Sequence, residues 1–424
     1  MARIASLFES ERTDMHTSIQ RTIDMLNEYG PRFRRWRVAW SGGKDSTAVV
    51  TLLAWLVASG KVAAPVDGLE VLYADTRMEL LPLVAVAASV QDELEARGIP
   101  VRVVMADIEK RFLPYILGRG VPPPNNNTMR WCTRQIKLDP MRAALERGGS
   151  ADDPVLVLTG VRLGESAARD QRIAVACSTK GGTECGSAHF QGMAQTTDGG
   201  AKFFQPAGAN GIATLAPIIH WRICHVWRWL CEWAPLPEYG EWDTELLANA
   251  YGGRDGDEAQ EIGARTGCVG CPLASEDSAL DAILKLPRWA YLAPLKELRQ
   301  VYRWLREPRQ RLRKAQEEVR KDGSWSKNAQ RMGPITLEAR LEAMNRILDI
   351  QRRVNDAAGT RPKLDILNTE EVQTITRLIA AGTWPDGWSG EEPRADTLIP
   401  GRFVVEDEDG QRVEEQLLLS WSAA

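Results

Sequence analysis

The sequence predicts an α/β protein, with a doubly wound, mostly parallel sheet (adenine nucleotide α-hydrolase-like) followed by a C-terminal helical region. In the first half, short apolar runs alternate with stretches of helical spacing, a pattern typical of βαβ units. A glycine turn follows the first apolar run, and doubly wound sheets bind ligands at the carboxyl ends of their strands. Beyond Cys271 the pattern becomes helical, with Pro and Gly separating the segments.

The individual elements follow from the apolar runs and from the residues that end them. Helices are predicted over 45–59 and 79–97, and Gly98 closes the second. Long irregular segments are expected at 110–130, which contains three consecutive prolines, and at 164–213, which is rich in Gly, Ser and Thr. Strands are predicted over 37–40, 68–74, 101–106 and 154–159.

Composition and charge exclude several classes of protein. The chain has 424 residues, of which 44% are hydrophobic, and this fraction is too high for a disordered protein. Its longest largely apolar run, 80–90, is shorter than the roughly 20 residues that a membrane helix needs. The first 16 residues lack the apolar core of a signal peptide, and the seven cysteines are an odd number. We therefore expect a cytoplasmic protein with no membrane segment, in which clustered cysteines bind metal or act in redox chemistry.

Charge is unevenly distributed, although the net charge is only −4. Residues 281–331 contain 14 basic and 6 acidic side chains, whereas residues 391–424 contain 3 basic and 9 acidic ones. We predict three regions: a catalytic domain with a cysteine-bound cluster at 1–275, a basic helical domain at 276–390 and an acidic tail at 391–424. The basic domain could bind DNA or a partner protein.

The strongest motif is the glycine turn between the first predicted strand and helix, Ser41-Gly42-Gly43-Lys44-Asp45-Ser46. Its glycines let the backbone approach a ligand closely, and the helix start supplies N–H donors and a positive dipole end. Lys44 adds a positive charge, and the two serines add hydroxyl donors. The turn differs from the P-loop G-x-x-x-x-G-K-[ST]. The motif predicts that the turn binds a phosphate group. The alternative is that the turn merely connects the strand to the helix.

This turn resembles the S-G-G-x-D-S signature of the PP-loop ATP pyrophosphatase superfamily. Members cleave ATP between the α- and β-phosphates and transfer AMP to a substrate oxygen. The resemblance implies that Ser41, Gly42, Gly43, Lys44, Asp45 and Ser46 bind the phosphates of ATP, that Mg2+ bridges phosphate oxygens, and that Asp75 and Thr76 lie near the adenosine.

Further segments resemble the phosphoadenosine-phosphosulfate reductase family, and together the matches cover roughly residues 35–275. Residues 130–137 are similar to its R-W-C-x-x-x-x-K segment, and residues 160–169 to its G-x-R-x-x-E-S-x-x-R segment. Residues 215–227 resemble its "P-I-x-x-W … V-W" segment. Each arginine here could instead be a solvated surface charge. The resemblance implies nucleotide contacts for Arg130, Lys137, Gly160, Arg162, Glu165 and Arg169.

The cysteines suggest a metal or redox site. Cys268 and Cys271 form a C-x-x-C unit, whose two thiolates can hold one metal centre if further ligands complete it. The residues themselves leave open an iron–sulfur cluster, a zinc site or a redox dithiol. Resemblance to the family favours a [4Fe–4S] cluster on Cys132, Cys185, Cys268 and Cys271, with Cys177 as the alternative fourth ligand. Cys224 and Cys231 are expected to be buried core residues.

Within the family, the chain looks most like the DndC-type sulfurtransferases of bacterial DNA phosphorothioation, a defence modification. This resemblance implies that ATP adenylylates a DNA backbone oxygen, which sulfur then replaces. It implies catalytic roles for Lys44, Asp45, Ser46, Arg162 and Cys132. It also implies three partners: a cysteine desulfurase as sulfur donor, a phosphorothioation ATPase or nickase, and DNA.

A DNA-facing surface is predicted in the basic helical region. Such a surface combines cations that neutralise phosphates with aromatic rings that stack on bases. The alternative is a solvated helical face. The residues that would form it are Arg299, Arg303, Arg306, Arg309, Arg311, Arg313 and Lys314, with Tyr291, Tyr302, Trp304 and Trp325.

Two other functions remain open on the sequence. One is sulfonucleotide (PAPS or APS) reduction, or thiolation of RNA or a small molecule. Family reductases carry a nucleophilic cysteine in a C-terminal E-C-G-x-H tail, but no cysteine follows Cys271 here, and the related string at 184–189 is mid-chain. The other is a non-enzymatic nucleotide-binding module of a defence complex.

Overall fold

The computed structural model describes residues 14–125, 130–147, 149–163, 201–251, 267–274, 276–314 and 332–397, with residue 323 and the short segments 194–195, 402–406 and 412–416. Its centre is a six-stranded sheet with the order β3-β2-β1-β4-β8-β7. All neighbouring pairs are parallel except β7 with β8. This arrangement confirms the predicted α/β fold with a doubly wound, mostly parallel sheet. The strands are β1 (Arg35–Trp40), β2 (Leu69–Ala74), β3 (Val101–Val104), β4 (Val155–Thr159), β7 (Phe204–Gln205) and β8 (Ile212–Leu215).

Residue periodicity explains these strands and the helices beside them. Alternate residues of β1 are buried, whereas β4 is apolar almost throughout, as expected for a central strand covered on both faces. Helix α2 (Lys44–Ala58) is apolar on most of its surface and is almost wholly buried against β1 and β4. Helix α3 (Leu81–Ala96) begins with Pro82 in its first turn, where the missing N–H costs nothing.

Three parts of the sheet domain depart from the expected pattern. Helix α1 (Met15–Tyr29) begins at Asp14, whose carboxylate accepts from the Thr17 N–H at 2.7 Å. The segment expected to be irregular after residue 110 contains a π-helical turn, η3 (Pro114–Gly118). Strand β8 lies at the end of the second such segment, and its four residues are too few for their alternation to stand out from a loop.

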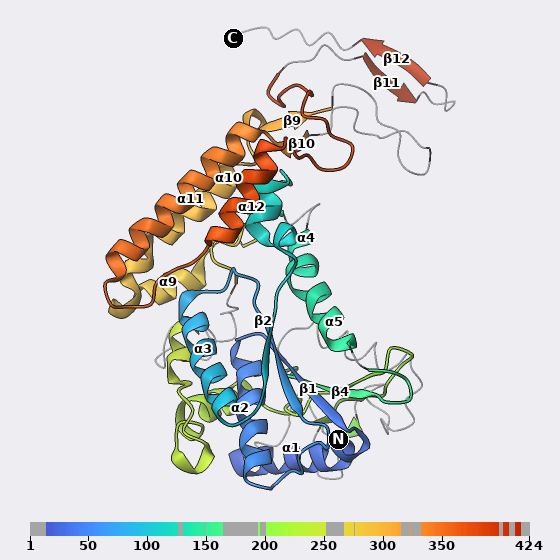
Figure 1. Cartoon of the computed structure of the whole chain (residues 1–424), viewed down its shortest axis with the longest axis vertical. Coiled ribbons are helices and arrows are strands. Elements are labelled where there is room, and N and C mark those ends of the chain that lie inside the picture. The colour runs from blue at the N-terminus through green and yellow to red at the C-terminus, as the bar shows by residue number, and fades with distance from the viewer. Residues whose placement is uncertain are drawn as a thin grey trace, which may run out of the picture.

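Helices of the last third of the chain gather at the end of the molecule away from the sheet (Figure 1). They are α9 (Ser278–Leu284), α10 (Glu297–Trp304), α11 (Leu337–Ala358) and α12 (Thr369–Ala380). The other helices are α4 (Trp131–Thr133), α5 (Asp139–Glu146), α7 (Ile223–Arg228) and the 3-10 or π turns η1 (Gly30–Arg32), η2 (Ile108–Lys110), η4 (Arg134–Leu138), η5 (Trp229–Trp233), η6 (Pro237–Tyr239), η7 (Glu245–Tyr251), η8 (Pro287–Lys296) and η9 (Pro308–Gln310). Among the described residues, three antiparallel pairs lie outside the main sheet: β5 (Ala194–Gln195) with β6 (Ala201–Lys202), β9 (Arg311–Arg313) with β10 (Met332–Ile335), and β11 (Arg402–Glu406) with β12 (Arg412–Gln416).

The hydrophobic core is continuous between the sheet and the C-terminal helices, because one cluster contains buried residues from Met15 to Ile375. A buried arginine reinforces this junction. Arg340 of α11 donates to the carbonyl oxygens of Gly118 at 3.2 Å, Ile335 at 2.8 Å and Thr383 at 2.7 Å. The domain limits at 275 and 390 stay predictions. None of the helices in the described ranges is both long and apolar enough to cross a bilayer.

Candidate nucleotide and thiol sites

The glycine turn lies where β1 passes into α2, between strands whose connections leave in opposite directions. The strand order places β2 on one side of β1 and β4 on the other, so this is the switch point where such sheets bind ligands. Gly42 has φ +70°, a conformation that a side chain disfavours. The Ser46 hydroxyl accepts from the Ser41 N–H at 3.2 Å and donates to the Gly43 carbonyl at 3.0 Å. These two hydrogen bonds close the turn on itself.

A chain of charges lies at the start of α2. Arg162, after β4, donates through Nε to Asp45 Oδ1 at 2.5 Å and through Nη1 to the Trp221 carbonyl at 3.3 Å. Lys44 Nζ lies 3.1 Å from the other carboxylate oxygen of Asp45. Arg162 is 4% exposed, so its orientation is fixed by the protein. The structure thus brings together the predicted residues Lys44, Asp45 and Arg162 beside the positive end of the helix, where phosphate binding is favoured.

Gly160 explains why β4 can approach the turn so closely. A Cβ atom at this position would lie 2.8 Å from Asp45 C and Ser46 N and 2.9 Å from Ser46 Cα. These are backbone atoms that cannot rotate away. The glycine at 160 is therefore needed for contact between β4 and the loop.

Replacing Gly160 with alanine should damage both the site and the fold. The added Cβ forces the first turn of α2 to move, so we expect a loss of about 1–3 kcal/mol in unfolding free energy. Pyrophosphate release from ATP should fall at least about tenfold, because the loop donors move. Thermal unfolding and a coupled pyrophosphate assay measure the two effects. In the control Gly60→Ala, the new Cβ meets nothing within 4 Å, although φ is +70°. It should lose some stability but keep its activity, and a fully active Gly160→Ala would contradict this packing.

Two hydroxyl groups that the sequence did not single out also lie beside the loop, those of Tyr251 and Thr159. The Tyr251 hydroxyl accepts from the Lys44 N–H at 3.2 Å, and its ring centroid lies 5.1 Å from Lys44 Nζ. Trp227 is partly buried and packs edge-on against this tyrosine, with ring centroids 5.1 Å apart. The Thr159 hydroxyl at the end of β4 is buried and has no hydrogen-bond partner among the described residues. A buried donor without a partner beside an anion site is suited to a ligand.

The end of β2 holds the two residues expected near adenosine. The Asp75 carboxylate accepts from the Arg77 N–H at 2.7 Å, and Thr76 Oγ1 donates to Glu79 at 2.6 Å. Glu79 also accepts from the Thr76 N–H. Burial raises the pKa of Glu79, and the nearby Asp75 carboxylate adds to this shift. The Thr76-x-x-Glu79 spacing is a capping-box pattern that could have revealed this turn.

Three of the four predicted cluster cysteines lie in one neighbourhood. Val269, inside the C-x-x-C unit, donates its N–H to the Met78 carbonyl at 2.7 Å, which ties the unit to the end of β2. Burial raises the pKa of Cys268 to about 12, and the charges of Glu79, Cys271 and Cys132 contribute. Burial likewise raises the pKa of Cys132, with a contribution from Cys271. Lys137 is near enough to oppose the shift at Cys268.

The donor chemistry of this neighbourhood fits a thiolate-bound centre. The Tyr302 hydroxyl is fully buried, has no partner among the described residues, and its pKa is raised by burial and by Cys268 and Cys271. A buried hydroxyl beside thiols can donate to sulfur. Still, within the described ranges no group of three or more His, Cys, Asp or Glu side chains is arranged to hold a metal ion. The predicted fourth ligand, Cys185, and its alternative, Cys177, lie outside the described residues.

The remaining predicted residues are divided between other places. Arg130 is exposed and lines a surface pocket with Trp131, away from the Asp45–Arg162 pair. Glu165 and Arg169 lie outside the described residues. Cys224 is exposed, so the prediction that it is a core residue is wrong, and Cys231 is partly buried. Cys224 lies in the first turn of the short helix α7, whose buried residues are His225 and Val226.

Much of the basic stretch expected to face DNA is engaged within the protein. Tyr302 is fully buried, and Tyr291 is nearly so, which excludes both from base stacking. Arg311 is buried and donates to the Gly333 carbonyl at 2.8 Å. Lys314 pairs with Glu392 at 2.8 Å, and Arg306 donates to the Pro124 carbonyl. These cations hold loops together, so this part of the predicted surface is wrong. Trp325 lies outside the described residues.

Taken together, the sheet and loop define an α/β domain with a glycine turn at its switch point. Residues 35–234, slightly less than half of the chain, match the family model described as the phosphoadenosine phosphosulfate reductase domain. Over this stretch the chain is similar to that domain.

Two solved structures show a lower level of likeness. One is the U34-tRNA thiolase NcsA from Methanococcus maripaludis with its [4Fe–4S] cluster. It is 15% identical in sequence, the match covers 54% of this chain and 70% of that chain, and the TM-score is 0.31. Another is the Candida glabrata FMN adenylyltransferase in complex with FMN and the ATP analogue AMPCPP. It is 12% identical in sequence, the match covers 54% of this chain and 61% of that chain, and the TM-score is 0.27. Likeness at this level assigns no substrate or cofactor to this chain. No curated protein matches the sequence.

Proposed function

We propose that this chain is an ATP pyrophosphatase that forms AMP and pyrophosphate and couples this reaction to sulfur transfer. The observation that carries the proposal is the loop at 41–46. It is closed by its own serines at a sheet switch point, with Lys44, Asp45 and Arg162 converging on the helix start. The loop would bind the two terminal phosphates, with a Mg2+ ion lowering their charge.

The roles of the residues follow from their positions. Lys44 and the N–H groups at the start of α2 stabilise the charge that develops on pyrophosphate as it leaves. Arg162 fixes Asp45, which in turn fixes Lys44. An acceptor oxygen attacks the α-phosphorus, the bond to the bridging oxygen breaks, and AMP stays on the acceptor. Tyr251 must give up its contact with the Lys44 N–H if a phosphate oxygen is to take that donor.

The sulfur half of the reaction would use the cysteine neighbourhood. This neighbourhood contains Cys132, Cys268 and Cys271 and lies near the carboxyl end of β2. The loop follows the carboxyl end of β1, the adjacent parallel strand. Cys132, Cys268, Cys271 and Cys185 would hold a [4Fe–4S] cluster, which could supply a site for sulfur when bound. A cysteine desulfurase is the proposed source of that sulfur.

For the acceptor we propose a DNA backbone phosphate, as in phosphorothioation. A phosphodiester oxygen is a poor leaving group, so adenylylation gives sulfur a group that it can displace. The test incubates the protein anaerobically with ATP, Mg2+, a cysteine desulfurase, cysteine, DNA and a thiol reductant, which supplies the two electrons that release sulfur from a persulfide. Nuclease digestion and mass spectrometry should then reveal phosphorothioate dinucleotides that depend on ATP. Thioredoxin-dependent release of sulfite from a sulfonucleotide would instead establish a reductase.

Removing one thiol should test the cluster independently of the acceptor. We expect protein purified without oxygen to be brown and Cys268→Ala to lose most of its iron, because the variant removes one of the thiolates that would hold the cluster. Iron content and the visible absorption spectrum measure this change. Cys224→Ala, which removes an exposed thiol outside the neighbourhood, should keep both. Zinc without iron in the native protein, or full iron retention in Cys268→Ala, would show that the ligands are misassigned.

A further inference from the structure

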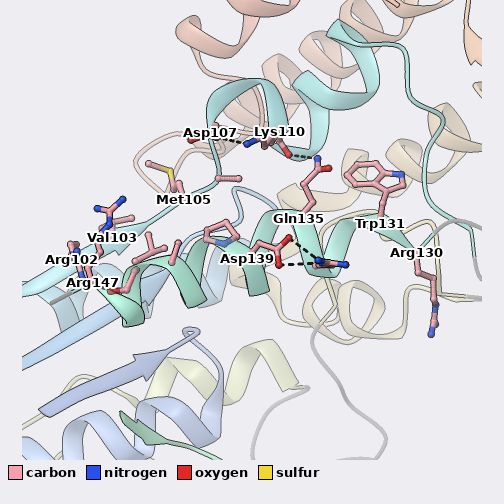
Figure 2. A pocket seen from close by; sticks show the side chains of 16 residues that line it. Arg102, Val103, Met105, Asp107, Lys110, Arg130, Trp131, Gln135, Asp139 and Arg147 are labelled. Atoms are coloured by element: carbon pink, nitrogen blue, oxygen red, sulfur yellow. Dashed lines mark hydrogen bonds and ion pairs between the residues drawn. The ribbon is translucent and has the colours of Figure 1, made fainter. Parts of the chain in front are cut away.

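A pocket of about 740 Å³ lies beside β3, the edge strand of the sheet. Its walls come from β3 and η2 on one side and from α4, η4 and α5 on the other. In Figure 2, Arg102 and Arg147 lie at one end of the pocket, and Trp131 and Arg130 at the other. The pocket is therefore an elongated groove, which we call the β3 groove. Its Trp131 end adjoins Cys132, the next residue in the chain.

The β3 groove is basic. Five Arg or Lys side chains line it, against two aspartates, Asp107 and Asp139. Both aspartates pair with groove cations, Asp107 with Lys110 at 2.7 Å and Asp139 with Arg134 at 3.3 Å. These pairs are exposed, and exposed ion pairs contribute little, so phosphates can take their place at low cost. The basic residues are Arg102, Lys110, Arg130, Arg134 and Arg147.

Apolar surface lies between the cations. Val103 and Met105 are each 40% exposed, which is unusual for such side chains next to a sheet core. The Trp131 ring is half-buried and stacks on Phe112 with centroids 5.6 Å apart. Cations that alternate with exposed apolar and aromatic groups match a strand whose phosphates and unpaired bases both need contacts.

We propose that the β3 groove binds a single-stranded segment of nucleic acid and leads it past Trp131 toward Cys132. This inference rests on the proposed function, for which it names the path of the acceptor strand. It also replaces the predicted surface at 299–314, where Arg306, Arg311 and Lys314 serve the fold instead. The groove cations bind the backbone, and the apolar floor contacts the faces of unpaired bases, which a duplex does not offer.

The test reverses two groove charges outside the nucleotide site. In the full-length protein, the double variant Arg134→Glu/Arg147→Glu is compared with Arg142→Glu. Arg142 lies in α5, the helix that ends just before Arg147, and it pairs with Asp139 at 3.1 Å, as Arg134 does. Its side chain is 60% exposed, but it does not line the groove. Fluorescence anisotropy with a labelled 20-nucleotide single strand, and with its duplex, is measured at several salt concentrations.

We expect the double variant to bind the single strand at least tenfold more weakly, while Arg142→Glu changes binding less than threefold. The slope of log affinity against log salt should become shallower by roughly 1.4, at about 0.7 for each lost phosphate contact. Native protein should prefer the single strand to the duplex. The proposal would be overturned if the two variants bound the single strand with equal affinity, or if the native protein bound the duplex as tightly as the single strand. It would also be overturned if the groove bound a protein segment in place of the strand.

A second readout separates this proposal from the proposed function. Pyrophosphate release from ATP without nucleic acid should be the same in the native protein and in both variants. If no pyrophosphate forms but the strand still binds through Arg134 and Arg147, the proposed function fails and the groove stands. If pyrophosphate forms but charge reversal leaves strand binding intact, the groove is wrong and the proposed function stands.

Discussion

Lys44→Ala should lower pyrophosphate release from ATP at least about 100-fold, because one positioned donor to developing charge accounts for that much of a rate. Lys44 is the first residue of α2, and its ammonium lies 3.1 Å from Asp45 and 5.1 Å from the Tyr251 ring. Both side chains of the Lys44–Asp45 pair are largely buried, 12% and 13% exposed, but Arg162 remains to neutralise Asp45, so we expect the unfolding free energy to fall by only about 1–3 kcal/mol. The variant thus separates chemistry from folding.

The matched control for this variant is Lys61→Ala. Lys61 also places its ammonium near an aromatic ring, 5.6 Å from that of Trp55, but outside the loop. It should keep full activity. Steady-state pyrophosphate release, with circular dichroism to check the fold, measures both variants. Equal turnover in the native protein and Lys44→Ala would place the catalytic site elsewhere.

Arg162→Met should be the most damaging single change to stability in the site. It removes the buried partner of Asp45 and leaves the carboxylate, whose side chain is 13% exposed, with Lys44 alone. Leaving a buried charge without its partner costs about 3–5 kcal/mol, and we expect the lower end because Lys44 remains. Activity should disappear as well, because the Asp45–Lys44 geometry is lost.

Adding Asp45→Asn to Arg162→Met should recover much of the stability but none of the activity, because the uncompensated charge is gone while the loop stays defective. Chemical denaturation gives the free energies of the double-mutant cycle. Arg37→Met serves as a control, since Arg37 pairs with Glu70 at 3.0 Å on the sheet, away from the loop. It should lose stability with activity retained. An active Arg162→Met would refute the charge chain.

The sheet domain could be predicted well because its signals are local. The apolar runs ending at Trp40, Ala74 and Thr159 became parallel strands with nearly the expected limits, since burial on both faces requires continuous apolar residues. The glycine turn could also be located, because a strand, two glycines and a helix define their geometry within a few residues.

Contacts between distant segments could not be predicted. Tyr251 is 207 residues from Lys44, and nothing around residue 251 signals that its hydroxyl meets the loop. The basic stretch failed for a related reason: a count of charges does not reveal that Arg311 is buried against the Gly333 carbonyl. The link between Cys132 and the C-x-x-C unit could be predicted, because the resemblance to the family places these cysteines around one cluster. Their separation in the sequence alone does not indicate it.

The products of ATP turnover test the central claim most directly. With ATP labelled at the α- and γ-phosphates, Mg2+ and an acceptor nucleic acid, the native protein should yield AMP, free or on the acceptor, together with pyrophosphate. Separation of the labelled products by anion-exchange chromatography reports both. Formation of ADP and orthophosphate would contradict a loop that binds the two terminal phosphates as one leaving group.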